Sequence, residues 1–154
     1  MRVGFMMVLS PREPILRFPD IAVHAEKAGF DMAWLGESQM ISKDAYTALT
    51  LAAVNTERIL LGPGVANPVT RHPTVLANTM AALNELSDGR AVLGIGNGDS
   101  AVRTIGARPA TVDRLRADVR CIRALLNGDE YLINETPARL LTAGEPVPIW
   151  ISAS

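Results

Sequence analysis

The sequence has 154 residues, of which 48% are hydrophobic and 20% are charged, and its formal net charge is −1. This composition is typical of a folded globular domain with a sizeable core. Basic residues do not cluster and aromatic residues are sparse, so we expect neither a nucleic-acid surface nor attachment to an anionic membrane. No apolar run approaches the ~20 residues that a transmembrane helix needs.

The cysteine and histidine content narrows the possible sites. The one cysteine, Cys121, lies beside an apolar helical stripe and predicts core packing, without an internal disulfide or a thiolate cluster. A single cysteine also fits a reducing cytoplasm. His24 and His72 are far apart, and neither has a partner at metal-ligand spacing. We therefore expect a cytoplasmic protein without a metal.

Strand-like apolar runs alternate with helical patterns from the start of the chain. The run Val3–Leu9 predicts a fully buried strand. Apolar residues at helical spacing follow over Ile15–Ala28, and Gly29 is well placed to end that helix. The short apolar run Met32–Gly36 predicts a second strand, and the Ala- and Leu-rich segment Ala45–Val54 predicts a second helix.

The same alternation continues through the second half. The further predicted elements are strands at Ile59–Leu61, Ala91–Ile95 and Pro148–Ser154, and helices at Pro73–Leu86 and Thr111–Leu126. Between the last helix and the last strand, Glu130–Gly144 is expected to be irregular, with room for a small hairpin.

This rhythm of strand and helix predicts a parallel α/β sheet covered by helices. Two architectures fit it: a complete, open, doubly wound sheet of five strands, or part of a (β/α)8 TIM barrel. A barrel typically needs ~250 residues, so this chain is about half of one and ends within a strand. We expect residues 1–154 to be the N-terminal part of a single barrel domain. The alternative is that they form a complete open fold.

The segment Leu60–Pro73 is the most specified loop in the chain. Two glycines and three prolines fall within twelve residues of it, which predicts that the third strand ends in an irregular loop. In any parallel α/β sheet the functional loops follow the carboxyl ends of the strands. That rule selects five segments: Met7–Pro11, Glu37–Met40, Gly62–His72, Gly96–Ser100 and Ser152–Ser154.

Two of these segments carry candidate chemistry. Gly96-x-Gly98-x-x-Ala101 matches a dinucleotide-binding fingerprint, which makes a Rossmann-type NAD site one alternative, and a tight turn without ligand another. Glu37 is the carboxylate at the tip of a short strand. In a functional role it would hydrogen-bond a cofactor ring or move a proton; in a structural role it would cap the next helix or pair with Lys43. His72 is expected to order its loop or cap the helix that follows.

The whole chain resembles the luciferase-like oxidoreductase superfamily, and within it the branch of deazaflavin-dependent methylenetetrahydromethanopterin reductases. The likeness rests on PREP near the start, AEKAGFD, WLGESQ, GPGVANPVTRHPTVLAN, ELSDGR, GIGNGDS and PIWISAS. The resemblance implies a (β/α)8 barrel, of which this chain would supply strands one to five and four helices. It also implies an oxidoreductase that uses coenzyme F420 or FMN for hydride transfer to, or monooxygenation of, a small organic substrate.

The resemblance further implies where the cofactor ring lies. It places a bulge with a non-proline cis peptide at Gly64–Val65, behind the ring. By the same match, the residues lining the cofactor site would be Glu37, Gly64, Val65, Ala66, Asn67, Gly96, Asn97, Gly98, Asp99, Ser152 and Ser154. The phosphate contacts would come from later strands of the barrel.

Two positions depart from the family pattern and leave the substrate open. Ser38 stands where many relatives have a histidine, and Met6 or Met7 stands where the reductases have an acidic residue. We therefore take Glu37 and Ser38 as the catalytic candidates. The alternative is a non-catalytic flavin-binding or half-barrel protein that works by association, since open sheet edges need a partner. On either hypothesis we expect a homodimer or higher oligomer.

Overall fold

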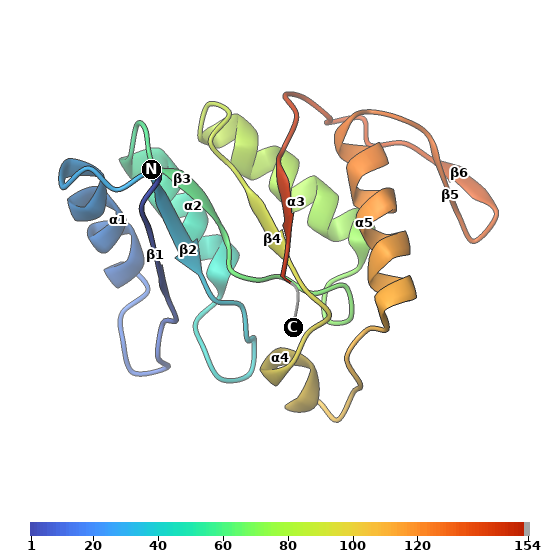
Figure 1. The fold of residues 1–154 in the computed structure, drawn as a ribbon, viewed down its shortest axis with the longest axis horizontal. Coiled ribbons are helices and arrows are strands. Elements are labelled where there is room, and N and C mark those ends of the chain that lie inside the picture. The colour runs from blue at the N-terminus through green and yellow to red at the C-terminus, as the bar shows by residue number, and fades with distance from the viewer. Residues whose placement is uncertain (153–154) are drawn as a thin grey trace.

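The computed structural model describes residues 1–152. Parallel strands lie side by side and helices cover one face of the sheet (Figure 1). The strands are β1 (Gly4–Met7), β2 (Met32–Leu35), β3 (Leu60–Pro63), β4 (Leu93–Ile95), β5 (Tyr131–Ile133), β6 (Thr136–Ala138) and β7 (Ile149–Ile151). The helices are α1 (Arg17–Lys27), α2 (Ala45–Asn55), α3 (Pro73–Leu86), α4 (Ser100–Arg103) and α5 (Val112–Leu126).

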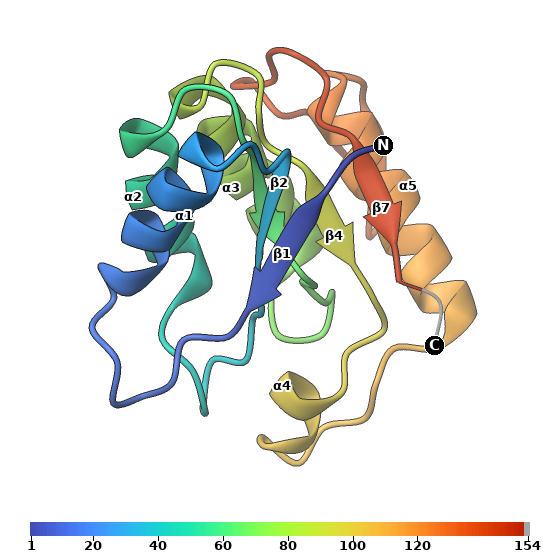
Figure 2. The same cartoon turned by 60° about the vertical axis from the view of Figure 1, so that its left-hand side comes forward.

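The strand order is sequential, and this decides between the two predicted architectures. β1, β2 and β3 pair in parallel in that order, and β4 pairs in parallel with β7. Parallel bridges from Leu61 to Ala91 and from Ala66 to Ile95 join β3 to β4. Figure 2 shows the sheet curving, with α1 and α2 on one side of the strands in this view and α5 on the other. A doubly wound sheet would reverse its order and carry helices on both faces, so that alternative is wrong.

Residues 1–152 form a curved α/β sheet that does not close into a barrel. Each apolar strand buries the side chains that face the helices. Leu35, Leu61, Leu93 and Ile95 are fully buried against helix residues such as Leu76 and Ile122. Cys121 belongs to the same core, as predicted.

The first strand is less buried than predicted. Its side chains alternate between exposed and half-buried, and Met6 is 65% exposed. Trp150 of β7 is 47% exposed, and it lines the same cavity as Met6. A continuous apolar run indicates two apolar faces, but it does not reveal whether both are covered.

The third strand extends further than predicted. β3 runs through Gly62 and Pro63, and after a two-residue bulge Ala66 rejoins the ladder with β4. A proline is tolerated at position 63 because it removes only one hydrogen bond of the sheet. The N–H of Leu61 points toward the β4 side, and residue 63 faces the same side, so the pairing with β2 is unaffected. Gly62 is required there, because a Cβ atom would overlap the carbonyl oxygen of Val92.

Caps fix the helices that follow the strands. Asp44 Oδ1 accepts the Thr47 N–H at the start of α2, and His72 caps α3 through the N–H of Thr74, as one of its two predicted roles. The predicted helix at 111–126 is α5, which Thr111 caps. Before it stands α4, a four-residue helix in a stretch predicted as loop.

Three further findings complete the fold. Strands β5 and β6 form a small antiparallel hairpin within the segment expected to be irregular. Among residues 1–152, no helix has the length and apolar character needed to cross a bilayer. In the same residues, no group of three or more histidine, cysteine and carboxylate side chains is arranged to hold a metal ion.

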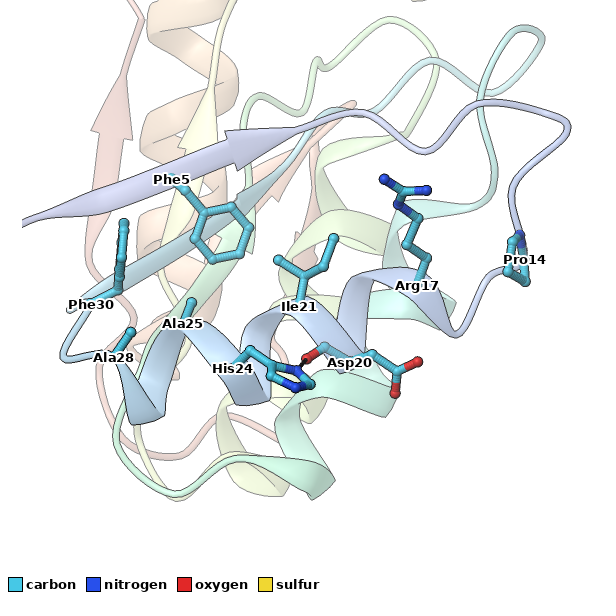
Figure 3. Close-up of a pocket in the computed structure, with 9 residues that line it drawn as sticks. All are labelled: Phe5, Pro14, Arg17, Asp20, Ile21, His24, Ala25, Ala28 and Phe30. Atoms are coloured by element: carbon cyan, nitrogen blue, oxygen red, sulfur yellow. Dashed lines mark hydrogen bonds between the residues drawn. The ribbon is translucent and has the colours of Figure 1, made fainter.

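The outer edge of the sheet carries an apolar groove of about 830 Å³ between β1 and α1. Phe5 of β1 and Phe30 face Ile21 and Ala25 of the helix across it (Figure 3). Among the described residues, β1 pairs only with β2, so its other edge has no strand beside it.

Candidate functional site

The loops that follow β1, β2, β3 and β4 meet at one end of the sheet. They enclose a cavity of about 260 Å³, whose lining includes Val8, Glu37, Ser38, Gly64, Val65, Asn67 and residues 98–101. This is the end of a parallel sheet where α/β proteins bind ligands. The loops that the sequence rule selected therefore lie together at this end of the sheet.

A second cavity of about 270 Å³ opens on the uncovered face of the sheet. Met6, Trp34, Trp150 and Ser152 line it, together with residues of β4. The two indole rings lie with their centroids 5.4 Å apart. Gly64 and Val65 line both cavities, so the bulge after β3 is the wall between them.

The bulge itself contains a cis peptide bond between Gly64 and Val65, as the family resemblance predicted. Its flanks are fixed by the sheet: Gly64 N–H donates to Leu35 O at 2.8 Å, and Ala66 N–H donates to Gly94 O at 2.8 Å. Within residues 1–152, neither the carbonyl of Gly64 nor the N–H of Val65 makes a hydrogen bond. This peptide group therefore has an acceptor and a donor available at the wall of the site.

Glycines make room for Trp34 beneath the bulge. A Cβ on Gly64 would lie 3.0 Å from Trp34 Cβ, and a Cβ on Gly94 would lie 3.2 Å from its ring. The indole thus packs directly on backbone, and the floor of the second cavity is flat and apolar on this side.

Asn67 organises the loop and is nearly fully buried. Its Oδ1 accepts the N–H of Val69 at 3.1 Å and the N–H and hydroxyl of Thr70. An asparagine that bonds backbone two and three residues ahead stabilises a turn. Its oxygen is therefore engaged in loop structure, and its contribution to a ligand would come from the amide nitrogen.

The segment after β4 divides between the site and the surface. Gly96 is buried next to the bulge without lining either cavity: a Cβ on it would lie 3.1 Å from Val65 Cγ2, and its N–H donates to Ala66 O. Gly98 has φ +89°, which favours glycine, and lines the first cavity. Asp99 points its carboxylate into solvent and pairs with Arg103, although its backbone borders the cavity.

Asn97 does not line either cavity; its carbonyl accepts the N–H of Ala110 at 2.8 Å. The Rossmann alternative is also not supported here. Its fingerprint opens the first strand–helix unit of a doubly wound sheet, whereas this one follows the fourth strand and leads into a four-residue helix.

Ser38 is buried and ties two exit loops together. Its hydroxyl shares a 3.2 Å hydrogen bond with the hydroxyl of Ser100, and the neighbouring Gln39 donates to the carbonyl of Ala101 at 2.9 Å. Both bonds link the β2 exit to α4 across the first cavity. Ser38 thus lies at the site, in contact with a residue of the loop after β4.

Glu37 has partners that the sequence did not indicate. Tyr46 Oη donates to its Oε2 at 2.9 Å, and Arg71 Nε approaches its Oε1 at 3.4 Å. Neither predicted structural role holds, because Asp44 caps α2 and no bond to Lys43 forms. Burial raises the pKa of Glu37 above its ordinary value, and the bonds from Tyr46 and Arg71 offset part of that rise.

The structure brings most of the predicted site residues to one place. The first cavity is lined by Glu37, Ser38, Gly64, Val65, Asn67, Gly98 and Asp99, and Ser152 lines the second. Three predicted site residues line neither cavity: Ala66, Gly96 and Asn97. Ser154 lies outside the described residues. Sequence reasoning missed Tyr46 and Arg71, and it gave no site role to Trp34 and Trp150, although both line the second cavity together with Met6.

Known proteins are similar to this chain over most of its length. A family model described as luciferase-like monooxygenase matches residues 2–154. The chain is 34% identical to the 5,10-methylenetetrahydromethanopterin reductase of Methanolobus tindarius, over 93% of this chain and 46% of the relative. It is 32% identical to the F420-dependent glucose-6-phosphate dehydrogenase of Kineococcus radiotolerans, over 89% of this chain and 46% of the relative.

A solved structure extends the likeness to three dimensions. The coenzyme F420-dependent tetrahydromethanopterin reductase of Methanopyrus kandleri superimposes with a TM-score of 0.81 at 27% identity, covering 99% of this chain and 50% of that one. The chain spans about half the length of the curated relatives it matches. From the strand-exit site, the family model and these relatives together, the chain belongs to the luciferase-like monooxygenase family.

Proposed function

We propose that the chain is the N-terminal part, residues 1–154, of a (β/α)8 barrel oxidoreductase. In this proposal the protein binds coenzyme F420, or FMN as the alternative, at the strand exits and acts on a small organic substrate by hydride transfer or monooxygenation. The observation that carries it is the Gly64–Val65 bulge, which stands between two cavities and whose peptide group makes no hydrogen bond within residues 1–152. Two relatives named for methylenetetrahydromethanopterin reduction and F420 dependence support the choice of cofactor.

The residues present fit a planar ring system. Ligand sites usually enclose ~300–1,000 Å³. Each cavity alone is somewhat smaller, but they share the bulge as a common wall. A side chain on Gly96 would crowd Val65, and one on Gly64 would crowd Trp34, so the glycines keep this wall flat. A flat wall with one carbonyl and one N–H suits the hydrogen-bonding edge of a flavin or deazaflavin.

The roles of the residues follow from their positions. The bulge, Gly96 and Ser152 would hold the ring, and the pair Trp34 and Trp150 would exclude water from its far side. When bound, the cofactor supplies the hydride. Glu37 would hold or move a proton at Oε1, and the Ser38 hydroxyl would orient the substrate or the ring edge.

The experiment is a fluorescence titration of the chain with F420 and, separately, with FMN. We expect saturable binding of one of them with a Kd below ~100 μM, which corresponds to about −5.5 kcal/mol. Replacing Trp150 by alanine should weaken binding at least tenfold. Leu141→Ala is the matched control, because Leu141 is 91% exposed and lines neither cavity. Failure of both cofactors to bind up to ~1 mM would refute the proposal.

The groove beside β1 favours a second candidate function, association without catalysis. An apolar groove next to an unpaired strand edge is a surface that a further strand–helix unit can cover. We infer that a second copy of the chain covers it, as a homodimer or higher oligomer in the cytoplasm, with no role for nucleic acid. Sedimentation velocity tests this.

In that experiment we expect a dimer that Ile21→Asp converts to a monomer. Ile21 lines the groove, whereas the exposed Val54 on α2 does not, so Val54→Asp is the control and should leave the dimer intact. A wild-type chain that stays monomeric at all concentrations would contradict association.

A further inference from the structure

The carboxyl group of Glu37 is held by two side chains that come from different parts of the chain. Tyr46 lies in the first turn of α2, and Arg71 immediately precedes the cap of α3. Tyr46 donates to Oε2 at 2.9 Å, and Arg71 Nε lies 3.4 Å from Oε1. Each oxygen of the carboxyl group therefore has its own partner.

The two partners also hold each other. The guanidinium carbon of Arg71 lies 4.1 Å from the centroid of the Tyr46 ring, a distance at which a cation stacks favourably on an aromatic face. Arg71 Nη2 reaches Asp44 Oδ2 at 4.0 Å. The arginine is thus fixed over the ring, and its Nε points to Glu37.

Stability alone does not account for this cluster. The side chains of Glu37 and Arg71 are only 7% and 25% exposed, and a buried ion pair usually stabilises a fold less than apolar residues of the same size. The cluster lies at the wall of the first cavity, where Glu37 itself is a lining residue. Perturbed buried carboxyls at such a wall are typical of functional sites.

We propose that Tyr46 and Arg71 are positioning residues that fix the Glu37 carboxyl group at the cavity wall and control its protonation. This inference rests on the proposed function, in which Glu37 exchanges a proton with the substrate or the cofactor. The tight bond from Tyr46 anchors Oε2. The longer contact from Arg71 leaves Oε1 as the atom that accepts the proton, and the donor keeps the electron pair of the broken bond.

The charges around Glu37 predict how each partner acts. Burial raises the pKa of Glu37, Tyr46 and Arg71 lower it, and Asp44 raises it slightly. Asp99 borders the same cavity, but its carboxylate is exposed and paired with Arg103. Burial raises the pKa of Tyr46 well above its ordinary value, so this phenol remains a neutral donor at every pH that the protein tolerates.

The test is a ¹³C NMR titration of the glutamate carboxyl carbons in the cofactor-free chain. We expect Tyr46→Phe and Arg71→Met each to raise the titration midpoint of Glu37 by about one pH unit, a tenfold change in proton affinity. Arg71→Lys should raise the midpoint less than Arg71→Met does, because lysine keeps the positive charge but lacks the stacked guanidinium with its directed Nε. Tyr131→Phe, the change at the other tyrosine, is the control and should leave the midpoint unchanged.

A second measurement ties the cluster to the site. The pH profile of cofactor affinity should move upward in Tyr46→Phe and Arg71→Met by the same amount as the NMR midpoint. An unchanged midpoint in both variants would overturn the inference, as would a moved midpoint with an unmoved affinity profile. If the wild-type chain binds neither F420 nor FMN while the midpoints move, the proposed function fails, and control of Glu37 protonation by Tyr46 and Arg71 stands.

Discussion

Arg90 offers the sharpest test of how the frame behind the site is held. Its guanidinium is buried between the end of α2 and the start of β3, with the residue only 9% exposed. All five N–H donors are used: Nε on Ser87 O, Nη1 on Thr56 Oγ1 and Ile59 O, and Nη2 on Ala53 O and Thr56 O, at 2.6 to 2.9 Å. Every acceptor is neutral.

Replacing Arg90 by alanine leaves five buried acceptors, four carbonyl oxygens and one hydroxyl, without this donor. Each lost hydrogen bond to a charged group is worth about 1.5–3 kcal/mol, and bonds sharing one side chain are not additive. We therefore expect a loss of about 3–5 kcal/mol from the free energy of unfolding, a large part of the ~5–15 kcal/mol of a typical domain. Arg90→Lys should lose about half as much, because one ammonium group cannot reach acceptors on three sides.

The assay is urea unfolding followed by circular dichroism. With a slope of ~1–3 kcal/mol per molar urea, the expected loss moves the midpoint by more than 1 M. Arg120→Ala is the matched control: this arginine is exposed on α5, and its side chain makes no hydrogen bond within residues 1–152. A midpoint for Arg90→Ala equal to that of the control would refute the reasoning.

Two further predictions concern the same frame. Partial burial raises the pKa of Glu26, but the hydrogen bonds from the N–H groups of residues 57–59 outweigh it and hold the pKa below its ordinary value. The ionised Glu26 carboxylate therefore stabilises the fold fully above pH ~4.5, and this stabilisation is lost as the pH falls through the folded-state pKa. Glu26→Gln should thus lose ~1–2 kcal/mol at pH 7 and less than that at pH 3, as measured by urea unfolding at both; an equal loss at both would contradict it. Gly62→Ala should lose at least ~2 kcal/mol because its Cβ overlaps the Val92 carbonyl, whereas Gly144→Ala, in open space, should unfold like wild type; equal midpoints would count against the close approach.

The sequence predicted the order of the elements well, because each parallel strand is a short apolar run and each long helix carries one apolar stripe. The end of the first helix at Gly29, with φ +88°, and the cap at His72 followed from local chemistry. The four-residue helix α4 was missed because a single turn shows no periodicity.

Burial on the uncovered face could not be predicted from the apolar pattern. Met6 and Trp150 are large hydrophobic residues of the kind found in cores, yet they are exposed and line a cavity on the face without helices. Hydrophobic residues at a ligand wall and in a core look alike in sequence.

The candidate site was predicted in two different ways. The strand-exit rule located the loops, and the family resemblance located the bulge and its cis peptide bond. The partners of Glu37 followed from neither, because Tyr46 is nine residues away and Arg71 is 34 residues away, and only the curved sheet brings them together.

The central claim, that the Gly64–Val65 bulge holds a flavin or deazaflavin ring, is tested most directly by a crystal structure of the chain soaked with F420. The account predicts ring density packed against this bulge, with the ring edge bonded to the carbonyl of Gly64 or the N–H of Val65. A ring bound elsewhere, with the bulge unchanged and in contact with solvent, would contradict it.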